Sequence, residues 1–178
     1  MPNWVQTNIT ITGSKDSIKK LLENVHGKET EDENETDFDF NKLIPMPDNI
    51  YKGNIGQKER ELYGADNWYD WSIKNWGTKW NAWDVYYDYG DKGATIAFQT
   101  AWDAPLPIYR ELEKQYPDLH FSIEYADEDL GNNCGWYENG EWTRADEVYE
   151  DCPRKAFDFA CDVWGYDADE MREEYGIA

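Results

Sequence analysis

Carboxylates are the residues of this chain most able to do chemistry, but their abundance weakens each individual candidate. The sequence holds 38 Asp and Glu among 178 residues, so pairs with the look of a hydrolytic dyad arise by chance. General acid–base catalysis needs two carboxyls in different environments, and divalent metals need ordered ligand spacing. The sequence indicates neither, so we predict no catalytic residue, no metal ligand and no cofactor, and expect a protein that is not an enzyme. The carboxylates weighed for these roles are Asp84, Asp88, Asp103, Asp127, Glu128 and Asp129.

Histidine and cysteine add no reactive pattern. His26 and His120 have no second His or Cys at ligand spacing, which disfavours a zinc site or a nucleophilic dyad. We expect Cys134, in the segment GNNCGW, to lie in an exposed loop without a basic neighbour, and Cys161 to pack on the apolar side of a helix. The odd cysteine number, the absence of a leader pattern and the lack of an apolar run of roughly 20 residues predict a cytoplasmic protein without a membrane partner.

Net charge is the most extreme property of the composition. The 38 acidic residues face 17 Lys and Arg, which gives a formal net charge of -21. Such a charge favours solubility and repels a nucleic-acid backbone, so we expect no direct nucleic-acid binding. Carboxylates concentrate in residues 28–39 and from Asp146 onward, where a solvated surface and a partner-binding surface both explain them. The candidate partner-binding residues are Glu29, Glu31, Asp32, Glu33, Glu35, Asp158, Asp162, Asp169, Glu170 and Glu173.

Tryptophans form the second unusual feature, with six of the ten inside residues 67–105. Their helical and strand spacing favours a buried aromatic core. The alternative is an exposed aromatic groove for a small ligand or a carbohydrate, formed by Trp76, Trp80 and Trp83. A base-stacking platform would need Lys and Arg beside the rings, whereas the neighbouring positions carry Asp and Glu.

The hydrophobic pattern places these residues on a predictable frame. Alternating segments predict strands at 4–12, 83–89, 94–99 and 119–125, and apolar stripes predict helices at 16–25, 66–77 and 105–117. The resulting order is strand, helix, insertion, hairpin, helix, strand. This order is typical of the ferredoxin-like split βαβ arrangement, an α+β fold with an antiparallel sheet and both helices on one face.

The remaining segments are interpreted as additions to that frame. Asn139-Gly140 predicts a tight hairpin turn, and helices are expected from Pro153 to Gly165 and after an N-cap at Asp167. We expect a ferredoxin-like domain at 1–142, with an acidic loop at 28–39 and an aromatic-rich helical insertion at 48–80. An acidic helical extension at 143–178 is expected to pack on the same domain, with the face that it covers left open.

Five segments of the sequence stand out together: MPNWVQTNITITGS, FDFNKLIPMP, NWGTKWNAWD, FQTAWDAP and PDLHFSIEYADEDLGNNCGWY. With them, residues 1 to about 142 resemble the YubB-type ferredoxin-like family, whose members are small proteins carried by phages and conjugative plasmids. It implies a ferredoxin-like core and a mobile-element origin, and it brings no known activity and no catalytic residues.

Charge and resemblance together lead to a functional expectation. We expect a non-enzymatic protein that acts by protein–protein contact on a host complex, such as a DNA- or RNA-handling defence effector, with its carboxylates imitating nucleic-acid phosphates. Binding of a small ligand or carbohydrate in the aromatic groove is the alternative. The oligomeric state stays open, because an exposed sheet edge offers a place for two copies to pair.

Overall fold

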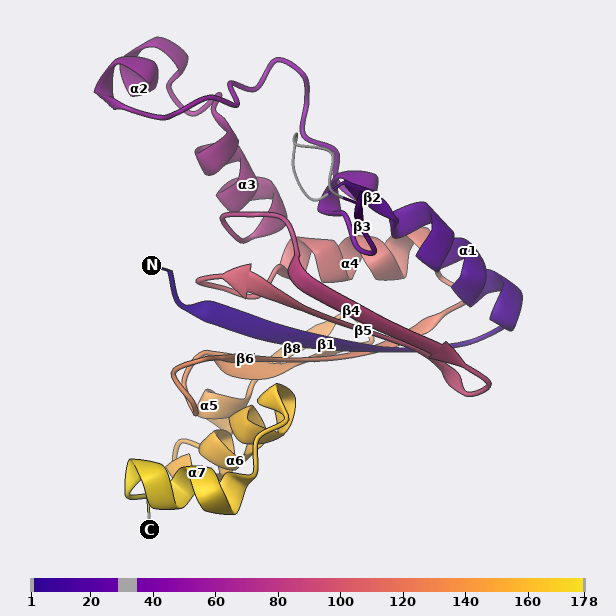
Figure 1. Ribbon diagram of the computed structural model, residues 1–178, viewed down its shortest axis with the longest axis vertical. Coiled ribbons are helices and arrows are strands. Elements are labelled where there is room, and N and C mark those ends of the chain that lie inside the picture. The colour runs from indigo at the N-terminus through magenta and orange to yellow at the C-terminus, as the bar shows by residue number, and fades with distance from the viewer. Residues whose placement is uncertain (1, 29–34, 178) are drawn as a thin grey trace.

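The computed structural model describes residues 2–28 and 35–177. Figure 1 shows one sheet with helices above and below it. The elements in chain order are β1 (Trp4–Thr12), α1 (Lys15–Val25), β2 (Gly27–Lys28), β3 (Glu35–Thr36), the 3₁₀ helix η1 (Phe40–Lys42), α2 (Gln57–Tyr63), α3 (Trp68–Trp76), β4 (Trp83–Gly90), β5 (Gly93–Ala101), α4 (Leu106–Gln115), β6 (His120–Asp127), β7 (Cys134–Glu138), β8 (Glu141–Arg144), α5 (Ala145–Val148), α6 (Pro153–Trp164) and α7 (Ala168–Tyr175).

The main sheet has six antiparallel strands in the order β4-β5-β1-β6-β7-β8. The first strand of the chain lies in the middle, because β1 pairs with β5 on one side and with β6 on the other, with Ile9 opposite both Ile96 and Ile123. Together with α1 and α4, the strands β1, β4, β5 and β6 form the split βαβ unit. The predicted α+β, ferredoxin-like fold class is confirmed.

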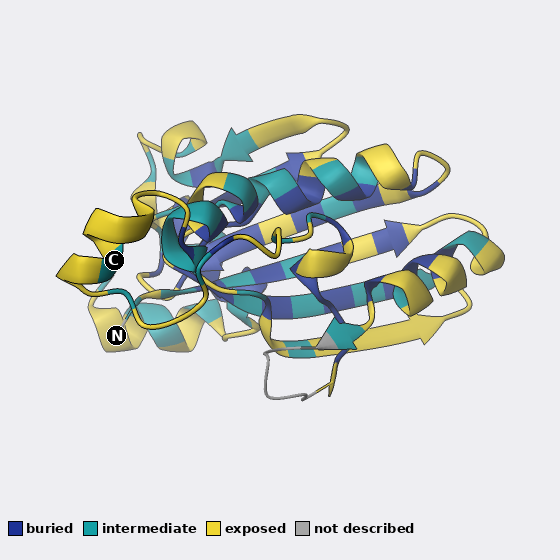
Figure 2. Ribbon diagram, turned by 90° about the horizontal axis from the view of Figure 1, so that it is seen from above, coloured by how far each residue is buried: buried dark blue, intermediate teal, exposed yellow. Residues whose placement is uncertain are grey.

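One face of the sheet packs against α1 and α4, which lie above it in Figure 1. Every second residue of the central strands points into this layer, as the alternation of buried residues along β1 and β5 shows. Figure 2 shows the same alternation as dark bands along the strands. A polar contact deep in the layer joins the hydroxyls of Thr7 and Tyr109 at 2.8 Å.

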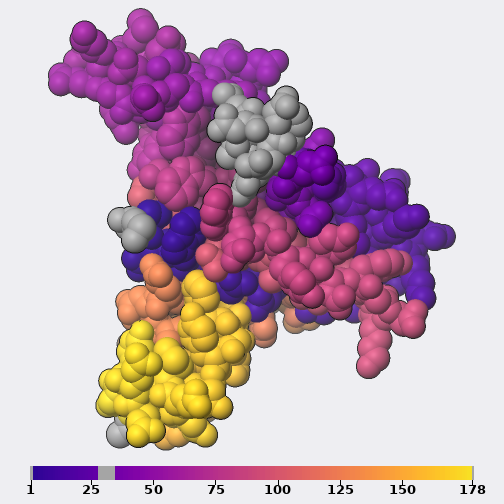
Figure 3. Space-filling model, in the orientation of Figure 1, coloured from indigo at the N-terminus to yellow at the C-terminus, as the bar shows by residue number. Residues whose placement is uncertain are grey.

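The insertion at 48–80 follows η1 and reaches away from the sheet. Phe40 of η1 and Trp76 of α3 pack edge to face with ring centroids 5.8 Å apart, so the end of α3 belongs to the core. The N-cap of α3 is Asn67, whose side chain accepts a hydrogen bond from the backbone of Asp70, so the helix begins slightly later than the expected range 66–77. Farther out, α2 has no buried residue, and Figure 3 shows it as a protruding arm at the top of the molecule.

The hairpin of β4 and β5 carries one irregularity. Its register shifts between Trp83 and Tyr86, which leaves one extra residue in β4, and Asp84 adopts a φ of 49° at that point. The alternation expected along the whole of residues 83–89 is therefore interrupted. Beyond the bulge, Tyr87 and Tyr89 lie opposite buried residues of β5 and share their face of the sheet.

The opposite face of the sheet is covered in part by α5, α6 and α7, which lie below it in Figure 1. The main contacts of α6 within the sheet are to β6, β1 and β7. The C-terminal helices thus form a third layer, and the sheet lies between two helical layers of different origin in the sequence.

Candidate functional site

The C-terminal layer, formed by α5, α6 and α7, is anchored to the sheet by polar contacts at the end of α6. The indole N–H of Trp164 donates to the carbonyl oxygens of Ala126 and Asp127, both at 3.1 Å. The amide of Asn8 donates to the carbonyl of Val163 at 2.7 Å. A separate apolar cluster fills the space beneath and includes Ala126, Leu130, Cys134, Ala145, Ala156, Phe157, Ala160, Cys161 and Val163.

Two of the predicted partner-binding carboxylates in this layer are neutralised within the protein. Arg172 of α7 forms ion pairs with Asp158 of α6 and with Asp169, and its own side chain is 11% exposed. Arg154 adds a longer contact of 3.9 Å to Asp158. Arg172 joins α6 to α7, so Asp158 contributes to the internal structure of the layer, and both Asp158 and Asp169 carry less free negative charge.

Three other predicted carboxylates of the layer remain available, one on α6 and two on α7. Asp162, Glu170 and Glu173 are exposed, and within the described part of the chain none of them has a cationic partner at ion-pair distance. Desolvation raises the pKa of Glu124 on β6, and the nearby charge of Asp162 raises it further. Negative charges therefore accumulate where α6 crosses the sheet. We call Asp162, Glu170 and Glu173 the acidic face.

The acidic loop contributes less to a describable site. Glu29, Glu31, Asp32 and Glu33 lie outside the described residues. Glu35 is described, and it is exposed on β3, which pairs with β2 in a small separate sheet. The structure therefore does not bring the loop carboxylates and the acidic face into one described surface.

The three tryptophans of the predicted aromatic groove do not share one surface. Trp76 is 4% exposed, and its indole N–H donates to the carbonyl of Ile44 at 2.9 Å, so it belongs to the core. Trp83 lines a shallow hollow with Glu35, Thr36, Asp37, Asp84 and Val85. Trp80 lies elsewhere, beside Trp4 with ring centroids 6.0 Å apart. A groove built from Trp76, Trp80 and Trp83 together is incompatible with the burial of Trp76.

A different aromatic group surrounds Trp80. The ammonium of Lys79 lies 4.2 Å from the ring centroid of Trp80 and 4.9 Å from that of Trp102. Such cation–π contacts hold a lysine between two exposed rings. We call Trp4, Lys79, Trp80 and Trp102 the tryptophan–lysine patch. Sequence reasoning missed it because the patch joins the start of β1, the α3–β4 connection and the end of β5.

The backbone at Trp102 adopts an unusual conformation. It has a φ of 74°, its ring is 42% exposed, and its N–H donates to the carbonyl of Asn3 at 2.9 Å. A bulky residue rarely adopts a positive φ, so the surrounding contacts must hold it there. The side-chain amide of Asn133 adds a hydrogen bond to the Trp102 carbonyl at 3.1 Å.

The carboxylates weighed for catalysis or metal binding have structural partners or lie apart. Asp127 is buried and accepts hydrogen bonds from the side chains of Asn3 and Asn133 and from the backbone of Asp129. Glu128 accepts one from the backbone of Trp4 at 3.1 Å. Asp103 accepts one from the backbone of Ala104 just before α4. Among the residues that the structure describes, no group of three or more His, Cys, Asp and Glu is arranged to hold a metal ion.

Cys134 requires a correction. It begins strand β7 and is fully buried, whereas the sequence suggested an exposed loop. Burial raises the pKa of its thiol to about 12, and the carboxylate of Asp146 raises it as well. Cys161 is buried as expected. The two histidines lie near carboxylates, with His26 3.3 Å from Asp37 and His120 3.2 Å from Glu138.

These features define the class of the protein, an α+β protein of ferredoxin-like fold with an added C-terminal layer. A comparison with family models matches residues 76–177 to the family described as the ferredoxin-like domain in Api92-like protein. Because this match spans more than half of the chain, the chain belongs to that family. The matched range starts at the end of α3 and includes the whole C-terminal layer.

The other comparisons add no relative, since neither the curated proteins nor the solved structures gave a match. The expectation of a ferredoxin-like family is confirmed. Among the described helices, none has the length and apolar character to span a bilayer.

Proposed function

We propose that this protein acts without catalysis, by binding a partner protein through the acidic face. The proposal rests on two features of the C-terminal layer. Its helices are held in place, and three of its carboxylates are exposed without a cationic partner among the described residues. Trp164 and Arg172 hold α6 and α7 in place, while Asp162, Glu170 and Glu173 stay exposed and unpaired in the described structure. A partner meets these charges without the cost of ordering a mobile tail.

The chemistry of this surface selects a cationic partner. The net charge of -21 attracts a basic protein from a distance, and exposed carboxylates complement Lys and Arg at close range. Proteins that handle DNA or RNA present basic grooves, and exposed carboxylates on helices that are held in place compete for them with phosphates. The proposed role is therefore that of a DNA mimic that inhibits a nucleic-acid-handling complex.

The resemblance to the YubB-type family narrows the setting. It supports a protein of a phage or plasmid, acting in the cytoplasm of a host cell on a defence complex such as a restriction or CRISPR effector. The ferredoxin-like family of this chain is compatible with that setting and does not by itself identify the partner.

The test compares two charge-reversal variants of equal net charge. Asp162→Lys, Glu170→Lys and Glu173→Lys together remove the acidic face, and Asp48→Lys, Glu61→Lys and Asp66→Lys reverse three exposed carboxylates of the insertion. The partner is captured from host lysate at low salt and then purified. We expect the first variant to lose at least about tenfold in affinity, equivalent to about 1.4 kcal/mol, and the second to stay near the wild type.

Salt provides an independent readout of the same proposal. Raising the ionic strength to about 0.5 M, where charges are screened within a few Å, should release the wild-type partner. Equal affinity of the two variants, each shown to be folded by circular dichroism, would remove the acidic face from the mechanism.

A second candidate function rests on the tryptophan–lysine patch. Trp80 and Trp102 are exposed and both contact the Lys79 ammonium, so the patch offers apolar ring surface beside a hydrogen-bond donor for a sugar or another small ligand. Titration with a carbohydrate panel should shift the tryptophan emission, and Trp102→Ala should abolish the shift. The buried Trp76 must not be replaced in this test, because it packs in the core.

A further inference from the structure

Strand β4 forms an open edge of the main sheet. It stands first in the strand order, with β5 as its hydrogen-bonded neighbour, and seven of its eight residues are exposed. Figure 3 shows this segment at the front surface of the molecule. Among the described residues, strand β3 lies near the start of β4, where Glu35 and Thr36 share a hollow with Trp83 and Val85. Within residues 2–28 and 35–177, the stretch 86–90 pairs with β5 alone, so that another strand can add to its outer side.

The hairpin register identifies the backbone groups that face outward. Gly90 pairs with Gly93 across a two-residue turn, and such a closing pair directs its hydrogen bonds inward. Pairs alternate between bonded and non-bonded along an antiparallel ladder. Tyr87 and Tyr89 occupy the non-bonded positions, so their N–H and C=O groups point away from β5 and toward the open edge.

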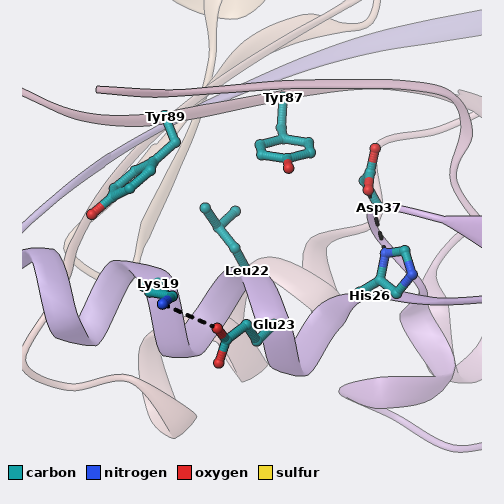
Figure 4. Close-up of a pocket in the computed structure, with 7 residues that line it drawn as sticks. All are labelled: Lys19, Leu22, Glu23, His26, Asp37, Tyr87 and Tyr89. Carbon is teal, nitrogen blue, oxygen red and sulfur yellow. Dashed lines mark hydrogen bonds and ion pairs between the residues drawn. The ribbon is translucent and has the colours of Figure 1, made fainter.

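The side chains of the same two tyrosines line a hollow beside that edge. Its volume is about 500 Å³, and Figure 4 shows Tyr87 and Tyr89 facing Leu22 of α1 across it. Both rings are about two-fifths exposed, with 42% for Tyr87 and 39% for Tyr89. Lys19 and Glu23 pair on one side of the hollow at 3.7 Å, and His26 and Asp37 on another at 3.3 Å. An added strand could therefore place one apolar side chain against the two tyrosines and Leu22.

The charges along β4 indicate which kind of strand can add to its open edge. Asp88 is exposed on β4 between the tyrosines, and Asp84 is exposed before the bulge. A symmetric antiparallel pair of two copies centred on Asp88 sets that carboxylate opposite its own copy, and one centred on Tyr86 sets Asp84 opposite Asp88. In the register centred on Tyr87 no carboxylates stand directly opposite each other, and the repulsion comes from the net charge alone. Like charges directly opposite each other destabilise a ladder, and each copy carries a net charge of -21. A strand with Lys or Arg at alternate positions complements this edge.

We infer that β4 binds an extended basic segment of a partner protein, which adds as a strand at residues 86–90 and places an apolar side chain in the hollow of Tyr87, Tyr89 and Leu22. Backbone hydrogen bonds supply affinity, and the alternation of basic and apolar side chains supplies specificity. This inference goes beyond the proposed function, because the open edge is a separate surface from the acidic face and works with or without it.

The probe for the test is an acetylated and amidated peptide of alternating lysine and leucine. A length of about seven residues covers the open edge at about 3.4 Å per residue. The control peptide has the same sequence and charge, with N-methyl groups at alternate residues that remove its backbone donors. Calorimetry should show binding of the first peptide and at least about a tenfold weaker binding of the second.

Three variants of the full chain separate the contributions of the Tyr87 ring, the Tyr87 backbone N–H and the Asp88 charge to the affinity for the peptide. Tyr87→Ala removes the ring, and we expect a loss of about tenfold in affinity. Tyr87→Pro also removes the outward N–H, which an edge strand tolerates, and should weaken binding further. Asp88→Lys should weaken binding by charge repulsion. The acidic-face variant of Asp162, Glu170 and Glu173 should bind the peptide with an affinity close to that of the wild type.

A measurement on the wild type keeps the test independent of variant folding. In NMR spectra, addition of the lysine–leucine peptide should shift the amides of Tyr87 and Tyr89 more than those of α7. Absence of binding, equal binding of the N-methylated peptide, or loss of binding in the acidic-face variant alone would overturn the inference. A dimer that Tyr87→Pro dissociates in sedimentation experiments would instead assign the edge to a second copy and overturn the choice of partner.

Discussion

At the scale of the residue, Cys134 shows how position determines reactivity. Its thiol is enclosed at the start of β7 by the C-terminal layer, and the lost hydration raises its pKa to about 12. A thiolate reacts and a thiol does not, so Cys134 stays inert in the folded chain. Cys152, half-buried before α6, lacks this protection.

We expect thiol titration to distinguish these cysteines. At about pH 8, an aromatic disulfide reagent should label Cys152 in the native protein and should reach Cys134 and Cys161 only after unfolding. The Cys152→Ser variant serves as the control and should show almost no native labelling. Rapid native reaction of that variant would contradict the buried position of Cys134.

The raised pKa of Cys134 also has a consequence for stability. Below about pH 8 the thiol is protonated in both folded and unfolded states, so it adds no pH dependence. As the pH rises above that range, the unfolded chain releases the proton first, and the free energy of unfolding falls. Replacement by Ala should reduce this loss between about pH 8 and 10, measured by denaturant titration at each pH.

The burial of Cys134 could not be predicted from the sequence, for a physical reason. The segment GNNCGW carries turn residues, and they do form a loop, in which Asn133 has a φ of 42° and Gly131 a φ of 89°. The chain returns to the sheet at Cys134 itself, and its cover comes from α6, where the thiol lies 3.9 Å from the carbonyl of Ala156. Contacts between such separate segments leave no local periodicity.

At the scale of the element, the turn between β7 and β8 agrees with its sequence. Asn139 and Gly140 have φ values of 52° and 80°, which match the two positive angles that a tight hairpin of this type requires. The Asn-Gly pair predicted this turn from local chemistry alone.

The Gly140→Ala variant tests this conformational requirement. An added Cβ meets only Glu113 Oε2, at 3.9 Å, so its cost comes from the left-handed backbone and should be about 1–2 kcal/mol in unfolding free energy. Gly90→Ala is a matched control, because Gly90 has open space and no positive φ, and should change stability by less than about 0.5 kcal/mol. Equal effects in urea titrations would refute the assignment.

The docking of α6 could not be predicted in the same way. The sequence predicted the apolar stripe of α6 and its end at Gly165. No local pattern, however, indicates which face of the sheet the helix covers. That choice depends on Trp164, whose N–H reaches two carbonyls at the end of β6. Likewise, the spacing of the tryptophans predicted an aromatic cluster. It could not predict that Trp76 is buried or that Trp80 lies beside Trp4.

Replacement of Trp164 should loosen the C-terminal layer. Trp164→Phe removes the hydrogen-bond donor and should cost about 1 kcal/mol, and Trp164→Ala also removes the ring and should cost about 2–4 kcal/mol. Hydrogen exchange should become faster in α6 and α7 and remain slow in β1. Uniform acceleration across both regions would mean that the layer unfolds only together with the sheet.

At the scale of the whole molecule, charge opposes compactness. A net charge of -21 produces mutual repulsion that the ion pairs of Arg172 relieve only locally. The strand alternation and helix stripes of the sequence predicted the ferredoxin-like order despite this charge, because burial of apolar residues sets the fold. The open edge of β4 has a different origin: among the described residues no further strand pairs with it, and no pattern in the sequence records such an absence.

Salt should therefore stabilise the protein. Between about 20 and 500 mM sodium chloride we expect the melting temperature to rise by several degrees as repulsion is screened. A sugar at the same osmolality controls for non-ionic effects. A melting temperature that is independent of salt would show that the carboxylates lie too far apart to repel one another.

The central position of β1 has a consequence for synthesis. The strand leaves the ribosome well before β5 and β6, its two neighbours, which follow much later in the chain. Until they appear, the apolar residues of β1 have no place to be buried, and the contacts that complete the sheet span large sequence separations. Strand β1 must therefore remain without its sheet partners until β5 has been made, and β6 is the element whose arrival closes the sheet around it.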